Sequence, residues 1–192
     1  WYLRITQFSE SVPKKVEEAL QELKEREVEG LILDLRNNSG GLVSSGIAVA
    51  DSLLSEKPVV ETKNRNGIKD AIVSQKETSY DGPMVTLVNK GTASASEILA
   101  GSLQDNERSI LMGEKTYGKG LIQSLKSLGE DSGIAITVAS YLTPKGNNIQ
   151  GQGMTPDKLL DLPDASEYGS ADDKWVRNAE LFLESILEKE EL

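Results

Sequence analysis

The chain has 192 residues, with 38% hydrophobic and 27% charged side chains, a composition that builds a buried core and is unlike that of a disordered chain. Its formal net charge of −10 argues against nucleic acid or an anionic membrane as the main partner. Histidine and cysteine are absent, which excludes imidazole bases, thiol nucleophiles, disulfides and zinc–thiolate sites. No apolar run approaches the roughly 20 residues of a membrane span, and we recognise no signal-peptide pattern in these residues.

The first half of the chain alternates between strand and helix patterns. Period-two alternation marks the first strand, helical spacing marks the segment that Ser11 is expected to cap, and a continuous apolar run is typical of a buried parallel strand. Two further segments flank the turn Asn64–Gly67 and predict a hairpin, with an irregular surface loop as the alternative. In chain order we expect a strand (1–8), a helix (12–26), a strand (30–35), a helix (47–54) and the hairpin (59–62 with 68–73).

The second half continues the same alternation, which predicts an α/β fold. Its expected elements are a strand (84–88), a helix (94–103), two strands (110–112 and 121–125), a long β-branched strand (133–142) and a last helix. The turn Thr143–Gly146 ends the long strand. Residues 163–170 read as a linker to the last helix, whose apolar face carries Trp175, Ala179, Phe182 and Ile186.

A serine lies where the strand at 84–88 is expected to pass into the next helix, in the run Gly91–Glu97. Helix N–H groups at such a junction favour developing negative charge. The pattern does not choose between Ser94 and Ser96, and an N-cap role is the alternative for either. Because histidine and cysteine are absent, a covalent hydrolytic mechanism needs an oxygen nucleophile and a base other than imidazole.

Lys119 lies between Gly118 and Gly120, and Gln123 follows four residues later. A lysine becomes a base when burial penalises its charged form. If the segment is extended, the side chains of Lys119 and Gln123 point to one face, so that the amide oxygen can orient the amine. A surface lysine and a half-exposed strand glutamine are the alternatives. A phosphate loop is disfavoured because its Gly-Lys-Ser/Thr ending is missing.

The turn Arg36–Gly41 follows a buried strand. Active sites in open α/β sheets gather at the carboxyl ends of strands. An N–H of the Gly-Gly pair is therefore a candidate donor for an oxyanion hole, together with the N–H next to the nucleophile. The alternative is a tight turn that needs positive φ at Gly40 or Gly41.

Taken together, these stretches resemble the C-terminal processing peptidases, also called tail-specific proteases, which are serine/lysine peptidases. The matching segments, in the family's order, are GLILDLRNNSGG (30–41), VNKGTASASEILAGSLQD (88–105), GEKTYGKGLIQ (113–123), GIAITVASYLTP (133–144) and GMTPD (153–157). They span most of the chain. The resemblance implies an α/β core similar to the crotonase and Clp-protease folds, with a mixed β-sheet and flanking helices.

The resemblance also implies the roles of individual residues. Ser94 matches the nucleophile and Lys119 matches the general base. Gln123 matches the residue that positions the base. Gly40 and Ala95 match the backbone N–H donors of the oxyanion hole. Asp105 matches an acidic position with a supporting role, and helix termination is its alternative. The implied activity is endoproteolysis of extended polypeptides near their C-termini through an acyl-enzyme, with no cofactor or metal.

The organisation of the protein follows from the same resemblance. Residues 1–163 form the peptidase core, and residues 164–192 form a linker and a helix that is a candidate for docking or dimerisation. Family members usually carry a PDZ domain just before the first strand. That domain is absent from this chain and is expected upstream in the full-length protein. The implied partners are polypeptides with unstructured C-termini, an oligomer is allowed, and the implied compartment is the periplasm or the thylakoid lumen.

Two other functions are compatible with the fold class. A non-catalytic peptide- or lipophile-binding module is one, because the retinoid-binding repeats of the eye resemble the same core. A crotonase-like acyl-CoA enzyme is the other, but the acidic chain shows no clear basic cluster for an adenine-phosphate site. The complete set of Ser94, Lys119 and Gln123 favours the peptidase over both.

Overall fold

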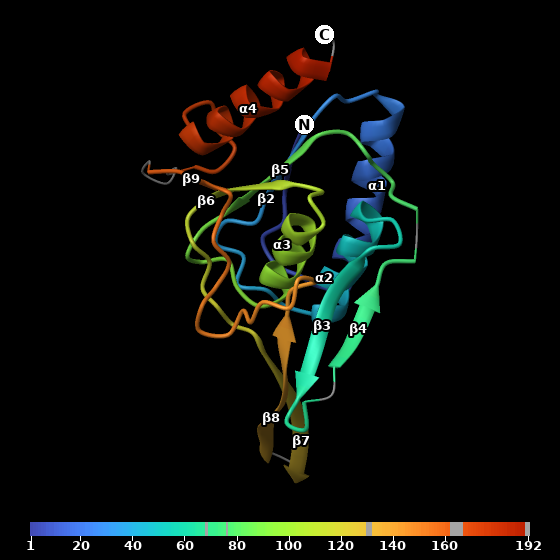
Figure 1. Ribbon diagram of the computed structural model, residues 1–192, viewed down its shortest axis with the longest axis vertical. Helices are drawn as coiled ribbons and strands as arrows, with labels where there is room; N and C mark the ends of the chain where they lie inside the picture. Colours follow the sequence, from blue (N-terminus) through green and yellow to red (C-terminus); the bar gives the residue numbers. More distant parts are fainter. Residues whose placement is uncertain (68, 76, 130–131, 162–166, 191–192) are drawn as a thin grey trace.

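The computed structural model describes residues 1–67, 69–75, 77–129, 132–161 and 167–190 (Figure 1). Within these ranges the elements are β1 (Tyr2–Arg4), α1 (Val12–Glu25), β2 (Leu31–Asp34), α2 (Val43–Leu53), β3 (Pro58–Asn64), β4 (Lys69–Val73), β5 (Met84–Val88), α3 (Ala95–Asp105), β6 (Ile110–Gly113), β7 (Leu121–Gly129), β8 (Ser132–Leu142), β9 (Lys158–Leu159) and α4 (Lys174–Glu190). The strands form a five-stranded sheet, in the order β1-β2-β5-β6-β9, and a four-stranded sheet, in the order β4-β3-β8-β7. The predicted α/β class with flanking helices is confirmed, and its mixed strands separate into two sheets.

The five-stranded sheet is parallel and is covered by helices on both faces. Side chains of β2 alternate between the two layers, as the period of two requires. Leu31 and Leu33 pack with residues of α1, α2 and α3, whereas Ile32 packs with α4. Because both faces are buried, β2 is hydrophobic without interruption from Leu31 to Leu33, which is the pattern that predicted a buried parallel strand.

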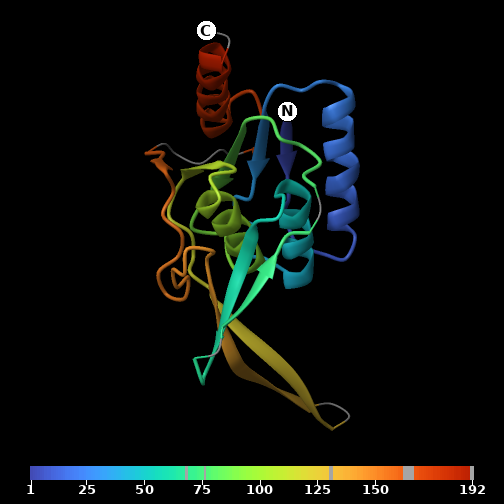
Figure 2. The same ribbon diagram turned by 45° about the vertical axis from the view of Figure 1, so that its right-hand side comes forward.

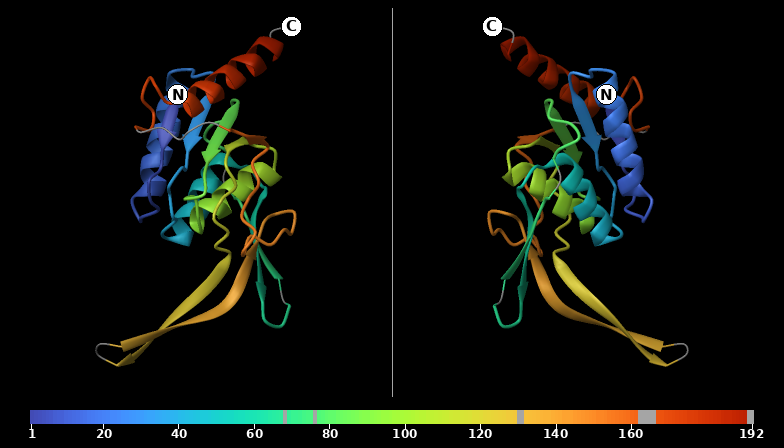
Figure 3. Two further views of the ribbon diagram at one scale, coloured as in Figure 1. Left: turned by 90° about the vertical axis from the view of Figure 1, so that its left-hand side faces the viewer. Right: turned by 90° about the vertical axis from the view of Figure 1, so that its right-hand side faces the viewer.

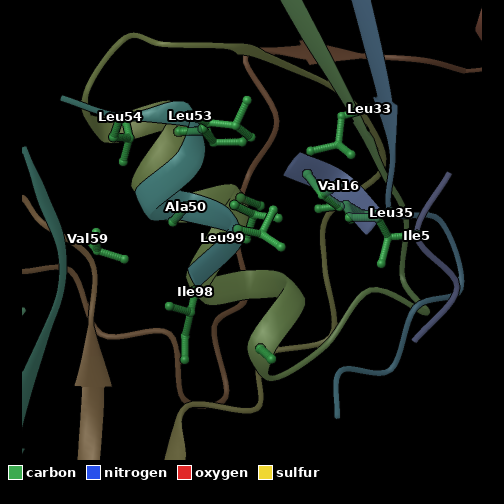
Figure 4. Close-up of a cluster of buried hydrophobic side chains, with 14 of the residues drawn as sticks. Ile5, Val16, Leu33, Leu35, Ala50, Leu53, Leu54, Val59, Ile98 and Leu99 are labelled. Atoms are coloured by element: carbon green, nitrogen blue, oxygen red, sulfur yellow. The ribbon is translucent and has the colours of Figure 1, made fainter. Parts of the chain in front are cut away.

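The larger core cluster lies between the sheet and the helices α1, α2 and α3. Figure 4 shows Ile98 and Leu99 of α3 beside Leu53 at the end of α2, all of them buried. Full burial of one such side chain is worth about 1.5–3 kcal/mol. This packing fixes α3 against the sheet, and with it the turn that leads into the helix.

The helix α4 packs on the opposite face of the parallel sheet. Trp175 is fully buried there, and Ala179 and Leu183 contact the same cluster as Ile32 of β2. The predicted apolar face of this helix is confirmed at its first positions. The expected linker at 163–170 lies partly outside the described residues. Neither α4 nor any other helix in the described ranges combines the length and apolarity needed to cross a membrane.

The four-stranded sheet is antiparallel and extends away from the helical layers. Figures 2 and 3 show the β7–β8 pair reaching out as a long arm, with the β3–β4 hairpin beside its base. The strand β8 has 11 residues and is the longest, as its β-branched sequence predicted. The expected hairpin is confirmed: the N–H of Gly67, at φ +80°, donates to the Asn64 carbonyl oxygen at 3.0 Å.

Two local predictions at the start of the chain were wrong. The strand expected over 1–8 is limited to β1, because the chain bends after Ile5, whose carbonyl oxygen accepts from Asn38 Nδ2 at 2.8 Å. Phe8 then forms only an isolated bridge with Gly41. Ser11 stands at the N-cap of α1 but makes no capping bond, because its own backbone is already helical, and its Oγ lies 3.2 Å from Ser9 Oγ.

Candidate active site

Three loops meet at the carboxyl ends of adjacent parallel strands. The strands β2, β5 and β6 are direct neighbours, so the segments that follow them leave the sheet at one edge. Backbone bonds join these segments: Ala93 N–H donates to the Asn38 carbonyl at 3.0 Å, and Tyr117 N–H donates to the Thr92 carbonyl at 3.0 Å. The glycine turn, the serine segment and the lysine loop are therefore brought together.

Ser94 occupies a sharp turn between β5 and α3. Its backbone has φ 58° and ψ −120°, which is an unusual conformation for a residue with a side chain. A strained strand-to-helix turn of this kind presents a serine nucleophile in other hydrolases. Ser96 differs, because it is fully buried and its Oγ donates to the Asn38 carbonyl at 3.0 Å. The geometry thus separates the two serines that the sequence pattern left open.

Glu97 joins the serine turn to the lysine loop, and the sequence analysis missed it. Its carboxylate is fully buried in the first turn of α3, where the helix dipole favours a negative charge. Oε2 accepts from the backbone N–H groups of Ser94 at 3.0 Å and Lys119 at 2.8 Å. Oε1 accepts from Thr116 Oγ1 at 2.6 Å and Gly118 N–H at 2.7 Å. The signal that could have found it is the Ser-x-x-Glu spacing of a capping box.

The Lys119 backbone is linked to the serine turn through Glu97, whereas Gln123 lies on β7. Glu97 holds the Lys119 backbone, and Gly118, at φ +93°, has no space for a side chain because a Cβ would lie 2.8 Å from Gly153 N. The side chains of Lys119 and Gln123 are both exposed. Within the described ranges no hydrogen bond links either side chain to Ser94. Because the side chain of Lys119 is exposed, the burial expected for it is not found in this structure.

Gly40 and Ala95 lie next to each other at the serine turn. A Cβ at Gly40 would come within 2.8 Å of Ser94 Cβ and 3.1 Å of Ala95 N, and its φ is +103°. The position therefore excludes any side chain. Ala95 N–H belongs to the first turn of α3, where backbone N–H groups lack intrahelical acceptors. Gly40 N–H donates to Asn38 Oδ1 at 2.9 Å in this structure.

Asp105 lies at the other end of α3 from the serine turn. Its Oδ2 accepts from Lys145 N–H at 2.8 Å, which fastens the turn after β8 to the helix. Asp105 makes no hydrogen bond to Ser94, Lys119 or Gln123 in the part of the chain that the structure describes. Its observed contact is structural.

A buried charge cluster lies at the start of the glycine turn and consists of Arg36, Asp34 and Asp173. Arg36 donates to Asp34 Oδ1 from Nε at 2.9 Å, and its two terminal nitrogens donate to Asp173 at 2.6 and 3.1 Å. All three side chains are buried. Burial opposes the charge of each partner, but their hydrogen bonds outweigh it, raising the pKa of Arg36 and lowering the pKa of Asp173. The cluster connects the end of β2 to the start of α4 across 137 residues, a link that no local pattern indicates.

Among the described residues, no group of three or more acidic side chains is arranged to hold a metal ion. The chemistry available at this edge of the sheet comes from a serine hydroxyl, a lysine amine and backbone N–H groups. These groups suit acyl transfer, in which a hydroxyl attacks a carbonyl and N–H donors hold the developing oxyanion.

Comparison with known proteins agrees with this chemistry. The profile of peptidase family S41 matches residues 1–160. A carboxyl-terminal-processing protease of Synechocystis is 51% identical over 162 residues, which are 84% of this chain and 38% of that protein. A chloroplastic C-terminal processing peptidase of Tetradesmus obliquus is 45% identical over 162 residues, covering 83% of this chain and 35% of that protein.

A solved structure shares the architecture. The photosystem II D1 C-terminal processing protease superposes with a TM-score of 0.79 at 43% identity, covering 83% of this chain and 42% of that one. This chain therefore spans about two fifths or less of the length of these relatives.

Proposed function

We propose, since this chain belongs to peptidase family S41, that it forms the catalytic core of a serine endopeptidase with a Ser94–Lys119 dyad. The observation that carries the proposal is the strained backbone of Ser94 at a strand-to-helix turn. That turn is tied through the buried carboxylate of Glu97 to the backbone of Lys119.

The reaction is acyl transfer to Ser94. Lys119 Nζ takes the proton of Ser94 Oγ while Oγ bonds to the substrate carbonyl carbon, and the N–H groups of Ala95 and Gly40 hold the oxyanion. The C–N bond then breaks, and Lys119 gives its proton to the leaving amine. Water repeats the sequence on the acyl-enzyme. For Gly40 to act, the carbonyl oxygen of the substrate must replace Asn38 Oδ1 as the acceptor of its N–H.

Because the side chain of Lys119 is exposed in the free chain, we propose that the bound substrate completes the site. A peptide laid over the loop covers the amine and displaces water, which favours the neutral form that a base requires. Gln123 follows on β7 and offers its amide oxygen to orient the amine. The backbone of the loop needs no rearrangement for this step, because Glu97 already holds it.

The names of the relatives support a proposal for the partners and the compartment. Those relatives are named as carboxyl-terminal-processing proteases, and two are from a cyanobacterium and a chloroplast. We extend to this chain a polypeptide substrate with an unstructured carboxyl end, cleaved near that end. The full-length protein carries a PDZ domain ahead of this core and works outside the cytoplasm, in a periplasm or thylakoid lumen.

The proposal is tested by cleavage of an unstructured fluorogenic peptide. We expect Ser94→Ala and Lys119→Arg each to lower kcat/KM by about a thousandfold or more. Arginine keeps the positive charge of Lys119 but does not deprotonate. Ser96→Ala is the matched control and should stay within about fivefold of wild type. Near wild-type cleavage by Ser94→Ala would show that the nucleophile is another residue, and no cleavage by the wild-type chain would show that this segment is not itself the catalytic core.

A further inference from the structure

A groove of about 540 Å³ opens on the four-stranded sheet, outside the serine turn. The tip of the β3–β4 hairpin, the body of β8 and the first residue of β7 line it. Three of its described lining residues are cationic, namely Lys63, Arg65 and Lys69, and none is acidic. The chain as a whole has a net charge of −10, so the groove reverses the prevailing sign. The three cationic residues belong to one hairpin, and the structure places them along one groove.

The strand register places the two lysines of the groove side by side. Lys63 of β3 is the direct partner of Lys69 on β4 and of Ser140 on β8, and Ser140 in turn pairs with Leu121 on β7. Like charges directly opposite each other on a sheet are destabilising. Lys69 Nζ forms an ion pair with Glu61 Oε2 at 3.1 Å, whereas Lys63 and Arg65 form no ion pair with any described residue. An anion bound in the groove would compensate both.

The same surface carries exposed apolar side chains. Leu121 is 37% exposed and Val138 is 44% exposed, and both line the groove. A ligand that matches this surface has a carboxylate at one end and apolar side chains along its length. The carboxyl-terminal end of a polypeptide has that chemistry.

The groove begins next to the proposed catalytic loop. Leu121 follows Lys119 by two residues and precedes Gln123 by two, so alternation puts Leu121 and Gln123 on one face of β7. Ile122 between them packs against the core, which assigns Leu121 and Gln123 to the outer face. The strand pairing continues from Leu121 of β7 to Ser140 of β8 and Lys63 of β3. A chain held at Lys119 therefore passes directly onto the groove.

We propose that the groove binds the free α-carboxylate and the last apolar residues of the substrate, beyond the bond that is cut. Lys63 and Arg65 contact the carboxylate, and Leu121 and Val138 contact the apolar side chains. This assignment rests on the proposed peptidase function. It gives the core its own means of selecting a chain end, because an internal peptide segment lacks the α-carboxylate.

The test compares three labelled peptides of one sequence: one with a free carboxyl end, one with a carboxamide, and one with a carboxamide following a terminal Asp. Their binding to the Ser94→Ala chain is measured by fluorescence anisotropy, and their cleavage by the wild-type chain gives kcat/KM. We expect the free acid to bind about five- to tenfold more tightly than the amide, which is the scale of exposed ion pairs. The difference should shrink as salt rises.

A double variant and a charge-matched control locate the effect. Lys63→Gln with Arg65→Gln should abolish the preference for the acid, so that the ratio of acid to amide falls to about one in binding and in kcat/KM. Lys15→Gln with Lys24→Gln removes the same charge from α1, outside the groove, and should keep the preference. An unchanged preference in the groove variant overturns the proposal, as does equal binding of the acid and the amide by the wild-type chain.

Two further outcomes would also reject the assignment to a chain end. If the Asp-amide binds as tightly as the acid, the groove recognises any carboxylate. If coenzyme A displaces the peptide at comparable concentration, the groove is a phosphate site. The binding arm does not depend on catalysis: a wild-type chain that cleaves none of the peptides contradicts the peptidase function, while the anisotropy series still decides the role of the groove.

Discussion

Replacement of Glu97 by glutamine tests whether one buried carboxylate holds the serine turn and the lysine loop together. The four groups that donate to Glu97 come from Ser94, Thr116, Gly118 and Lys119, at 2.6–3.0 Å. An amide has only one acceptor oxygen. If that oxygen stays with Ser94 and Lys119, the NH₂ group faces the Gly118 N–H, and a buried donor loses its acceptor.

The cost can be worked out from these contacts. A buried N–H without an acceptor costs about 1–3 kcal/mol, and losing the charge weakens the two bonds that remain. The Thr116 hydroxyl can turn to accept from the new amide, so its bond need not be lost. We therefore expect Glu97→Gln to lower the free energy of unfolding by about 3 kcal/mol. Movement of the loop by about 1 Å should lower kcat by about a hundredfold.

The assay combines urea unfolding with peptide cleavage under conditions where both chains are folded. A positioning role predicts that kcat falls while KM changes little, because the groups that contact the substrate remain. Thr116→Ser keeps the hydroxyl that donates to Glu97, so it is the matched control and should stay within a few-fold in kcat. A Glu97→Gln chain that is destabilised but turns over at the wild-type rate would refute the argument, since the carboxylate would then serve the fold alone.

Two other substitutions test the surroundings of the site. Gly40→Ala should lower kcat/KM at least a hundredfold, because its Cβ would lie 2.8 Å from Ser94 Cβ. The control Gly67→Ala also has positive φ but nothing within 4 Å, so it should cost about 1 kcal/mol of stability and no activity. Equal activities of the Gly40→Ala and Gly67→Ala chains would contradict the argument that the Gly40 backbone approaches Ser94 too closely for a side chain. Asp173→Asn should cost about 3 kcal/mol near neutral pH, because it breaks a buried pair with Arg36. The pKa of Asp173 is lowered in the folded chain, so this contribution is complete above about pH 5 and declines as pH falls through the folded pKa; urea unfolding at several pH values checks it, and a pH-independent difference would contradict it.

Much of the fold could be predicted because the patterns of hydrophobicity are local. The strand expected at 84–88 is β5 with the same bounds, since every residue in it is buried. Its neighbours β2 and β6 are parallel to it, and their loops therefore had to meet at one edge. That geometric rule joined Gly40, Ser94 and Lys119, which lie far apart in the sequence.

What the sequence could not show depends on contacts between distant residues. The spacing of Ser94 and Glu97 indicates a helix start, but nothing local shows that the carboxylate also holds backbone N–H groups 21 and 22 residues further on. The pair of Arg36 and Asp173 spans 137 residues and is equally invisible. Ser11 makes no capping bond for a local reason, because its own backbone is already helical, with φ −83° and ψ −16°.

The central claim is that Ser94 carries the acyl group of a cleaved polypeptide. The most direct measurement is mass spectrometry of the chain quenched with acid during turnover of a slowly hydrolysed peptide ester. The account predicts a mass increase equal to the amino-terminal half of the substrate, located by fragmentation on Ser94 and absent from Ser94→Ala. An adduct on Ser96 or on another residue, or turnover of this slowly hydrolysed ester without any adduct, would contradict it.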